Sequence, residues 1–220
     1  NQPISILQMK NLKRHDFDKL DHVHRINMIN SCSGYKSANL IGTKSNIGVS
    51  NVAIFSSVTH LGSNPPLLGV VFRPVTDVPR NTYENIKETG QFTINHIHTP
   101  IIEEAHHTSA KYSKEISEFK ITTLEEEFKN DWYAPFVKNA PIQIALTYCE
   151  EYLIKSNNCI QLIGEIKDLF IREDLLEKDG FINLEKGNIV AINGLDGYTL
   201  PKLKTRLKFQ RPKKYLKSKT

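Results

Sequence analysis

The chain has 220 residues, with 39% apolar and 24% charged side chains and a formal net charge of +5. A chain of this length and composition can bury a sizeable core, which excludes global disorder, and its apolar runs all fall short of the roughly 18 residues that span a membrane. The charge is unevenly placed: nine basic residues and no acidic residue follow position 201, so residues 1–201 carry about −4 (5 minus 9).

Residues 1–24 mix charged and apolar positions without clear periodicity, and we expect them to wrap the surface of the domain. Apolar and β-branched residues between turn signals then predict strands at residues 25–29, 38–43 and 48–57. Residues 67–72 form a continuous apolar run that begins after two prolines and stops before a third, which favours a strand buried on both faces.

The clearest helix is predicted over residues 81–90. Asn81 suits the N-cap, Glu84 suits the capping-box position three residues later, and Gly90 suits the C-terminus. Residues 92–97 follow as an alternating strand. Apolar spacing and a second capping box predict two further helices, at residues 101–112 and 123–128.

The last third of the chain returns to alternating patterns, which predict strands at residues 142–149, 159–170, 189–192 and 202–209. Gly164 interrupts the longest of these and is expected to mark a bulge or a bend. About eight short strands and three helices, without a linker, predict one mainly β domain over residues 1–220, built as a closed or split barrel with peripheral helices.

One stretch of the predicted sheet carries an unusual number of hydroxyls. Val52, Ile54 and Val58 suit a half-buried strand, whereas the hydroxyl-bearing residues of the same stretch are Ser56, Ser57 and Thr59. Buried hydroxyls need hydrogen-bond partners, and either the nearby backbone or a ligand could supply them.

The start of the helix predicted over residues 81–90 is suited to an anion. Unpaired N–H groups and the positive end of the helix dipole lie there, and Arg80 adds a fork of donors that matches a phosphate. The alternative is an ordinary helix cap with a surface arginine at position 80.

Taken in order, these segments resemble the flavin reductase-like family of FMN-binding split barrels. The motifs that carry the resemblance are Ser50-Asn51-Val52-Ala53, Phe55-Ser56-Ser57, His60-Leu61-Gly62-Ser63-Asn64-Pro65-Pro66, Arg80-Asn81-Thr82-Tyr83-Glu84-Asn85-Ile86 and Thr93-Ile94-Asn95-His96. The resemblance extends over nearly the whole chain, and it implies a Greek-key antiparallel split β-barrel that forms a homodimer with the flavin near the interface.

The resemblance also implies the cofactor, FMN, and its contacts. The isoalloxazine ring is expected against Asn51, Val52 and Ala53. The ribityl chain and phosphate are expected near Ser56, Ser57, Val58, Thr59, Arg80, Asn81 and Thr82.

The implied activity is an NAD(P)H-dependent reductase that passes electrons through the flavin to free flavin, a ferric chelate or a partner protein. No catalytic acid or base is predicted, because the flavin carries the reaction. A flavin-binding electron carrier or flavin store without nicotinamide turnover is the alternative.

Two other classes of function are disfavoured by the sequence. The basic C-terminal segment, residues 202–220, could attract nucleic acid or a membrane surface, but it lacks the interleaved aromatic residues of a base-stacking surface. A polyanion-binding or membrane-surface module remains an alternative of a different class. No metal site is predicted, because the paired histidines have no third ligand at a recognisable spacing: His22 and His24, His96 and His98, His106 and His107.

The cysteines and the N-terminus indicate a reducing setting. The three cysteines, Cys32, Cys149 and Cys159, contain no C-x-x-C pair, and the chain has no Asn-x-Ser/Thr acceptor site and no secretory signal pattern at its start. We therefore expect a cytoplasmic protein with buried thiols.

Overall fold

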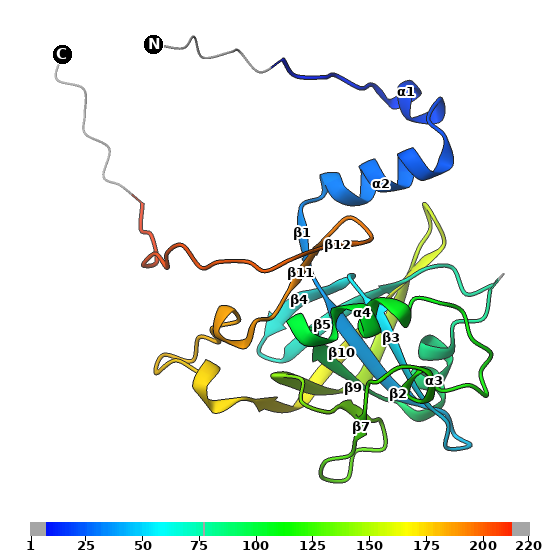
Figure 1. Cartoon of the computed structure of the whole chain (residues 1–220), viewed down its shortest axis with the longest axis vertical. Coiled ribbons are helices and arrows are strands. Elements are labelled where there is room, and N and C mark those ends of the chain that lie inside the picture. The colour runs from blue at the N-terminus through cyan, green and yellow to red at the C-terminus, as the bar shows by residue number, and fades with distance from the viewer. Residues whose placement is uncertain (1–7, 77, 213–220) are drawn as a thin grey trace.

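The computed structural model describes residues 8–76 and 78–212. Its main feature is a seven-stranded antiparallel sheet in the order β3-β2-β6-β9-β10-β5-β4 (Figure 1). These strands are β2 (Asn39–Lys44), β3 (Ser50–Phe55), β4 (Val58–Ser63), β5 (Pro66–Phe72), β6 (Gln91–His96), β9 (Ile142–Ile154) and β10 (Cys159–Ile171).

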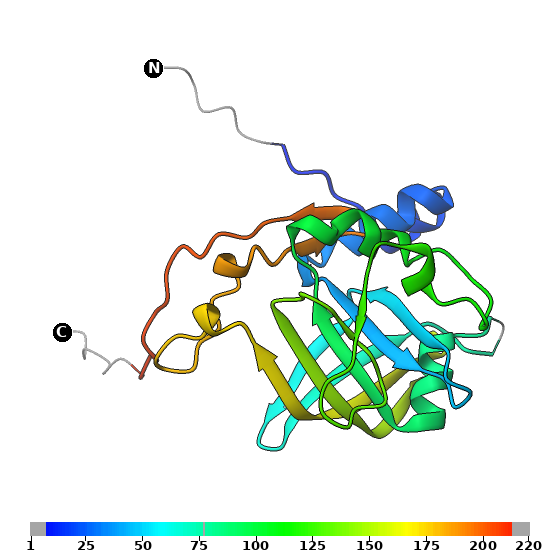
Figure 2. The ribbon, with the colours of Figure 1, turned by 60° about the horizontal axis from the view of Figure 1, so that its bottom comes forward.

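The sheet is curled into a barrel because its two edge strands are consecutive in the chain. β3 and β4 lie at opposite edges of the sheet, yet only Ser56 and Ser57 join them. Such a link spans at most about 10 Å, so the two edges must come together. The result is the split barrel that the sequence predicts (Figure 2), in which β3 and β4 are not paired with each other.

The barrel interior is filled by the apolar residues that alternate along each strand. Ile41, Ile94 and Ile144 are direct neighbours across β2, β6 and β9, and all three are buried. Gly164 of β10 lies at a shift in register against β9, so the predicted bulge is confirmed. A Cβ at this position would lie 2.5 Å from the Phe92 ring, so only glycine leaves room for that fully buried phenylalanine.

Helix α3 (Asn81–Thr89) covers one end of the barrel, with Ile86 fully buried in the barrel core. Gly90 ends the helix in the left-handed conformation (φ 71°), as the sequence predicts. The N-cap is Arg80, one residue before the predicted Asn81, and no side chain caps the helix. The Asn81 side chain instead donates to the carbonyl of Tyr112 (3.4 Å).

A second layer packs on the outer face of β2 and β3. It consists of η1 (Thr99–Ile101), α4 (Ile102–His107), α5 (Glu118–Ile121), β7 (Glu126–Glu127) and β8 (Phe136–Val137). Its core is a separate apolar cluster in which Leu40 and Val52 of the sheet meet Phe119 and Val137 of the layer.

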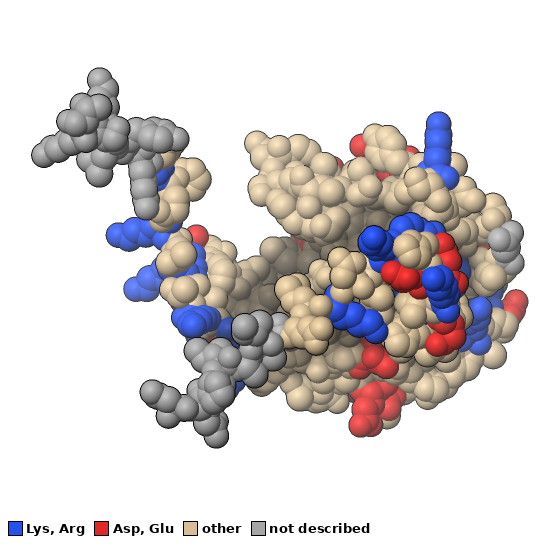
Figure 3. Space-filling model, turned by 90° about the horizontal axis from the view of Figure 1, so that it is seen from above, with Lys and Arg blue, Asp and Glu red and all other residues tan. Residues whose placement is uncertain are grey.

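Both ends of the described chain extend away from the barrel. At the N-terminal end lie α1 (Arg14–Asp18) and α2 (His22–Cys32). A small sheet follows, formed by β1 (Tyr35–Ser37), β11 (Ala191–Asn193) and β12 (Gly197–Thr199). Two short helices precede β11 in the chain, η2 (Glu173–Leu175) and η3 (Glu185–Gly187). Residues 200–212 are exposed and have no regular structure, and several of their basic side chains lie along one side of the molecule (Figure 3). Arg206 pairs with Asp179 (2.7 Å) and lies over the Phe181 ring. α1 and α2 project from the barrel, so residues 8–24 do not wrap its surface as the sequence predicts (Figures 1 and 2). Residues 1–7 of the predicted segment lie outside the described residues.

Three predicted elements are wrong. The strand at residues 25–29 lies within α2, where the Asp21 carboxylate accepts from the His24 amide and caps the helix. The helix at residues 123–128 is replaced by β7, because its backbone pairs with β8. The edge strand at residues 202–209 does not form, because this segment has no strand beside it in the described structure.

Other differences concern lengths and burial. The sequence analysis missed α1, β1, β4, β8 and β12, and the helix predicted over residues 101–112 ends at His107. Cys32 and Cys149 are exposed and Cys159 is partly exposed, so the expected burial of the thiols is wrong. Cys32 ends the projecting α2, and the other two cysteines lie on β9 and β10, which form a long hairpin. No helix of the described segments is long and apolar enough to cross a membrane.

Candidate functional site

The Ser56-Ser57 link and the start of α3 are held next to the same strand end. The Ser57 hydroxyl donates to the carbonyl of Val71 on β5 (2.8 Å), and Arg80 Nε donates to the carbonyl of Pro74, just beyond β5 (3.4 Å). The Phe72 ring lies between them, 5.1 Å from Phe55 and 5.6 Å from Tyr83, measured between ring centroids. Ser57 and Arg80, far apart in the sequence, are therefore both attached to the C-terminal part of β5 and the residues just beyond it.

The donors gathered here suit a phosphate. Two part-buried serines lie on the link, Arg80 is part-buried at the N-terminus of a nine-residue helix, and its bond to Pro74 uses only one of the guanidinium donors. Helix N–H groups, hydroxyls and a guanidinium are the groups that bind phosphates in proteins. The Ser57 proton is committed to Val71, so this hydroxyl must rotate before it can donate to a ligand.

The predicted ring contact Asn51 is buried, and its hydrogen bonds are satisfied within the protein. Its Oδ1 accepts from the hydroxyls of Thr82 (3.1 Å) and Thr43 (3.5 Å), and its Nδ2 donates to Glu118 Oε2 (2.7 Å). Thr82 is also buried, so its hydroxyl ties the first turn of α3 to β3.

Glu118 is the residue that the sequence analysis missed. It is 4% exposed, and the same Oε2 also accepts from the amide of Val52 (3.1 Å). Burial raises the pKa of Glu118, and the hydrogen bonds from its own backbone, Val52 and Asn51 oppose that shift. No local pattern marks this acid, because its partners lie 66 and 67 positions earlier in the chain.

The bond from Val52 also shows which way the edge of β3 faces. Because the Val52 N–H points away from β2, the alternation of a strand turns the Ile54 N–H in the same direction. Ala53 pairs with Ile41 and shares its face toward the barrel interior. β3 therefore turns two backbone N–H groups toward the split, of which Glu118 accepts that of Val52.

The remaining predicted site residues lie on β4 and at the helix start. Val58 is partly buried and packs against the barrel core, whereas Thr59 is exposed. Asn81 is partly buried beside Tyr112. The structure thus attaches Ser57 to Val71 of β5 and Arg80 to Pro74 just beyond β5, and it joins Asn51 to Thr82 by a hydrogen bond.

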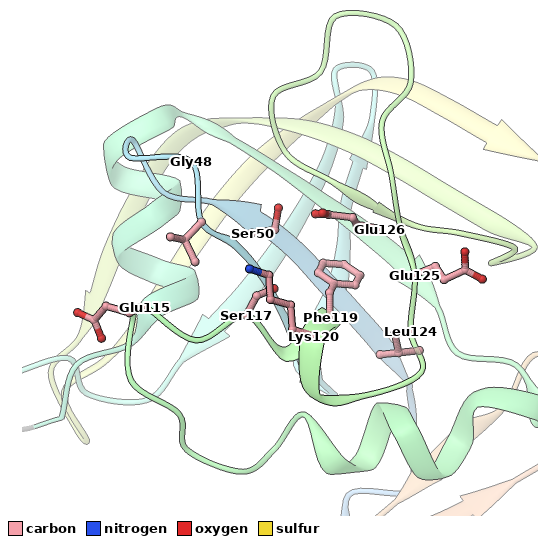
Figure 4. Close-up of a pocket in the computed structure, with 10 residues that line it drawn as sticks. Gly48, Ser50, Glu115, Ser117, Phe119, Lys120, Leu124, Glu125 and Glu126 are labelled. Carbon is pink, nitrogen blue, oxygen red and sulfur yellow. The ribbon is translucent and has the colours of Figure 1, made fainter.

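A separate hollow of about 490 Å³ lies between the loop before β3 and residues 115–126 (Figure 4). Its rim carries three carboxylates, from Glu115, Glu125 and Glu126, against the single cation of Lys120. An acidic rim repels a phosphate. The hollow is therefore a poor candidate for the phosphate site.

The paired histidines do not gather with other ligands. His96 and His98 each bury Nδ1 without a hydrogen-bond partner, and burial lowers the pKa of His96 to about 4. Over residues 8–76 and 78–212, no three His, Cys, Asp or Glu side chains are grouped as a metal site would require.

Comparison with known proteins identifies the family. The model of the flavin reductase like domain matches residues 34–187. The chain belongs to the flavin reductase-like family. Family membership makes it a flavin-related oxidoreductase, and α1 and α2 lie outside the matched residues.

Solved structures agree with the split-barrel fold of this flavin reductase-like chain. A split-barrel protein from Shewanella frigidimarina NCIMB 400, described as a flavin reductase, is 42% identical, with a TM-score of 0.88 over 92% of this chain and 100% of the other. Nitrilotriacetate monooxygenase component B from Bacillus cereus is 20% identical (TM-score 0.78; 91% and 99% covered). An FMN-binding protein from Thermus thermophilus is 15% identical (TM-score 0.67; 81% and 93% covered). At these lower identities, the last two support the fold alone.

Proposed function

We propose that this chain binds FMN non-covalently along the split and uses it to pass electrons from NAD(P)H to an acceptor, which is free flavin, a ferric chelate or a partner protein. Membership of the flavin reductase-like family supports a flavin ligand. The 42% identical relative described as a flavin reductase supports the reductase activity.

The observation that carries this proposal is that Ser57 of the link and Arg80 at the start of α3 are hydrogen-bonded to Val71 and Pro74, three residues apart. Arg80 and Ser57 are both anchored to the end of β5, so a phosphate at the split would meet a guanidinium, hydroxyls and helix N–H groups together. Asn81 and the Thr82 backbone would complete this phosphate site.

The ring side of the site would lie along β3. The backbone of Ala53 and the outward N–H of Ile54 would face the isoalloxazine, whereas Asn51 and Val52 would support that strand from buried positions. Bound FMN would supply the hydride and electron transfer. The protein would hold the phosphate, orient the ring and limit the access of water, and we assign no side chain as acid or base.

The assembly and location belong to the same proposal. We propose a cytoplasmic homodimer with the flavin near the interface. The nicotinamide would stack on the flavin, since the chain has neither a G-x-G-x-x-G nor a P-loop motif for a separate nucleotide site.

The test is an FMN titration followed by visible absorption, and then steady-state oxidation of NADH and of NADPH with added FMN. The proposal expects saturable binding and oxidation of at least one donor. FMN binding with neither donor oxidised would favour the electron carrier or flavin store. No FMN binding would contradict the proposal.

A further inference from the structure

Glu118 is a buried carboxylate that neutral groups hold in place. Among the described residues it forms no ion pair, and its hydrogen-bond partners are the side chain of Asn51 and the amide of Val52. A buried charge without a counter-ion destabilises a fold. What Glu118 contributes at this place is therefore the acceptor oxygen that it offers to Asn51 and Val52.

The carboxylate fixes the orientation of the Asn51 amide. With Nδ2 bound to Glu118, the Asn51 oxygen must face Thr82, whose hydroxyl donates to it. A flipped amide would place its oxygen against the carboxylate, which is repulsive. The carboxylate thus sets, through one amide, how the first turn of α3 sits against β3.

The segment that carries Glu118 is packed in place. Ser117 and Phe119 on either side are 4% and 9% exposed, and Phe119 belongs to the apolar cluster on the outer face of the barrel. A residue on a movable lid could swing away and leave β3 to a ligand. Glu118 is held instead against β3. This favours a role in supporting the site over a role in competing with a ligand for β3.

We propose that Glu118 is a positioning residue of the flavin site, which acts through Asn51 and Thr82 to place the N-terminus of α3 against the split. Arg80 precedes Thr82 by two residues, so a shift of this turn would move the phosphate donors away from the Ser56-Ser57 link. The inference rests on the proposed binding of FMN.

The experiment compares FMN dissociation constants of the full-length chain and three variants by titration with absorption and fluorescence. Glu118→Met keeps the bulk but removes the acceptor, and we expect binding weaker by at least about tenfold, since two buried donors lose their partner. Glu118→Gln keeps an acceptor oxygen and should bind within about threefold of the wild type. Glu115→Met, three residues earlier and exposed, is the matched control and should bind like the wild type.

Far-UV circular dichroism and the melting midpoint must show that each variant is folded at the titration temperature. If Glu118→Met is not folded, Thr82→Val tests the inference in its place. It removes only the hydroxyl that donates to Asn51 and should also weaken FMN binding. If Glu118→Met or Thr82→Val is folded and binds FMN as tightly as the wild type, or more tightly, the positioning role of Glu118 is wrong, whereas the proposed function stands. A wild-type chain that binds no FMN would overturn the proposed function and this inference with it.

Discussion

Arg80 is the side chain on which the proposed phosphate site depends most. Its guanidinium lies at the helix start and carries the permanent charge of the donor set. Arg80→Gln should therefore weaken FMN binding by about 10- to 100-fold, since hydrogen bonds to charged groups contribute about 1.5–3 kcal/mol. Fluorescence titration measures this, with Arg14→Gln on the projecting α1 as the matched control. Equal affinities for the two variants would contradict the assignment.

His96 makes the stability of the chain depend on pH. Burial lowers its pKa from 6.5 to about 4, so between these values the unfolded chain binds the proton more readily than the folded chain. The stability is therefore fully present above pH 6.5 and falls as the pH drops toward 4, by at most about 3 kcal/mol for this group.

The check is urea unfolding between pH 7 and pH 4.5 for the wild type and His96→Gln. The wild type should lose more stability over this range, whereas the glutamine cannot take up a proton. Other titrating groups, including Glu118 and His98, are common to both chains and cancel in the difference. The matched control is His15→Gln on α1, and an equal pH dependence for the wild type and His96→Gln would contradict the prediction.

At the scale of single elements, strand β10 depends on the glycine at its bulge. Gly164→Ala would place a methyl group 2.5 Å from the fully buried Phe92 ring, and we expect a loss of about 1–3 kcal/mol in the free energy of unfolding. Gly69→Ala in neighbouring β5 is the matched control, because its methyl group would meet the end of the flexible Leu61 side chain at 3.1 Å. Urea unfolding should rank Gly164→Ala well below Gly69→Ala, and the reverse order would refute the packing argument.

The elements that the sequence predicted correctly are those with strong local signals. Alternation and an apolar run identified β2, β5 and β6, and Gly90 identified the end of α3. β4 was missed because its polar, largely exposed sequence has little apolar alternation, and only pairing with β5 makes it a strand. α2 was mistaken for a strand because the β-branched residues near position 26 were weighed above the Asp21 cap.

The site was predictable only in part, because only some of its residues carry a local signal in the sequence. Ser57 and Arg80 stand out as residue types in a local motif, and the structure attaches them to Val71 and Pro74 at the end of β5 and just beyond it. The commitment of Asn51 and Thr82 to internal hydrogen bonds depends on tertiary contacts, as does the role of Glu118. Those contacts leave no trace in local spacing.

At the scale of the whole molecule, the projecting α2 indicates a missing partner surface. It has 11 residues, none of them buried, and Val23 and Ile29 are 60% and 45% exposed. An isolated helix of this length is marginal in water, so contacts with another surface are expected to stabilise it. A second copy of the chain is the partner that we predict.

Size-exclusion chromatography with light scattering should therefore give twice the 25.1 kDa mass of one chain. Val23→Glu together with Ile29→Glu should shift the mass toward the monomer, because charges are poorly tolerated in a buried interface. Lys19→Glu with Lys13→Glu, near α1, changes charge without touching apolar residues and serves as the control. A monomeric wild type at micromolar concentration would contradict the prediction.

The joining of both sheet edges by Ser56 and Ser57 has a consequence for how such a site can vary. The width of the opening is set by the number of backbone atoms that bridge it, and the side chains beside it adjust only its lining. Insertion of one residue would lengthen the link and widen the opening between β3 and β4 for larger ligands, whereas a deletion would close it. The length of this link thus limits the size of a ligand that can lie between β3 and β4.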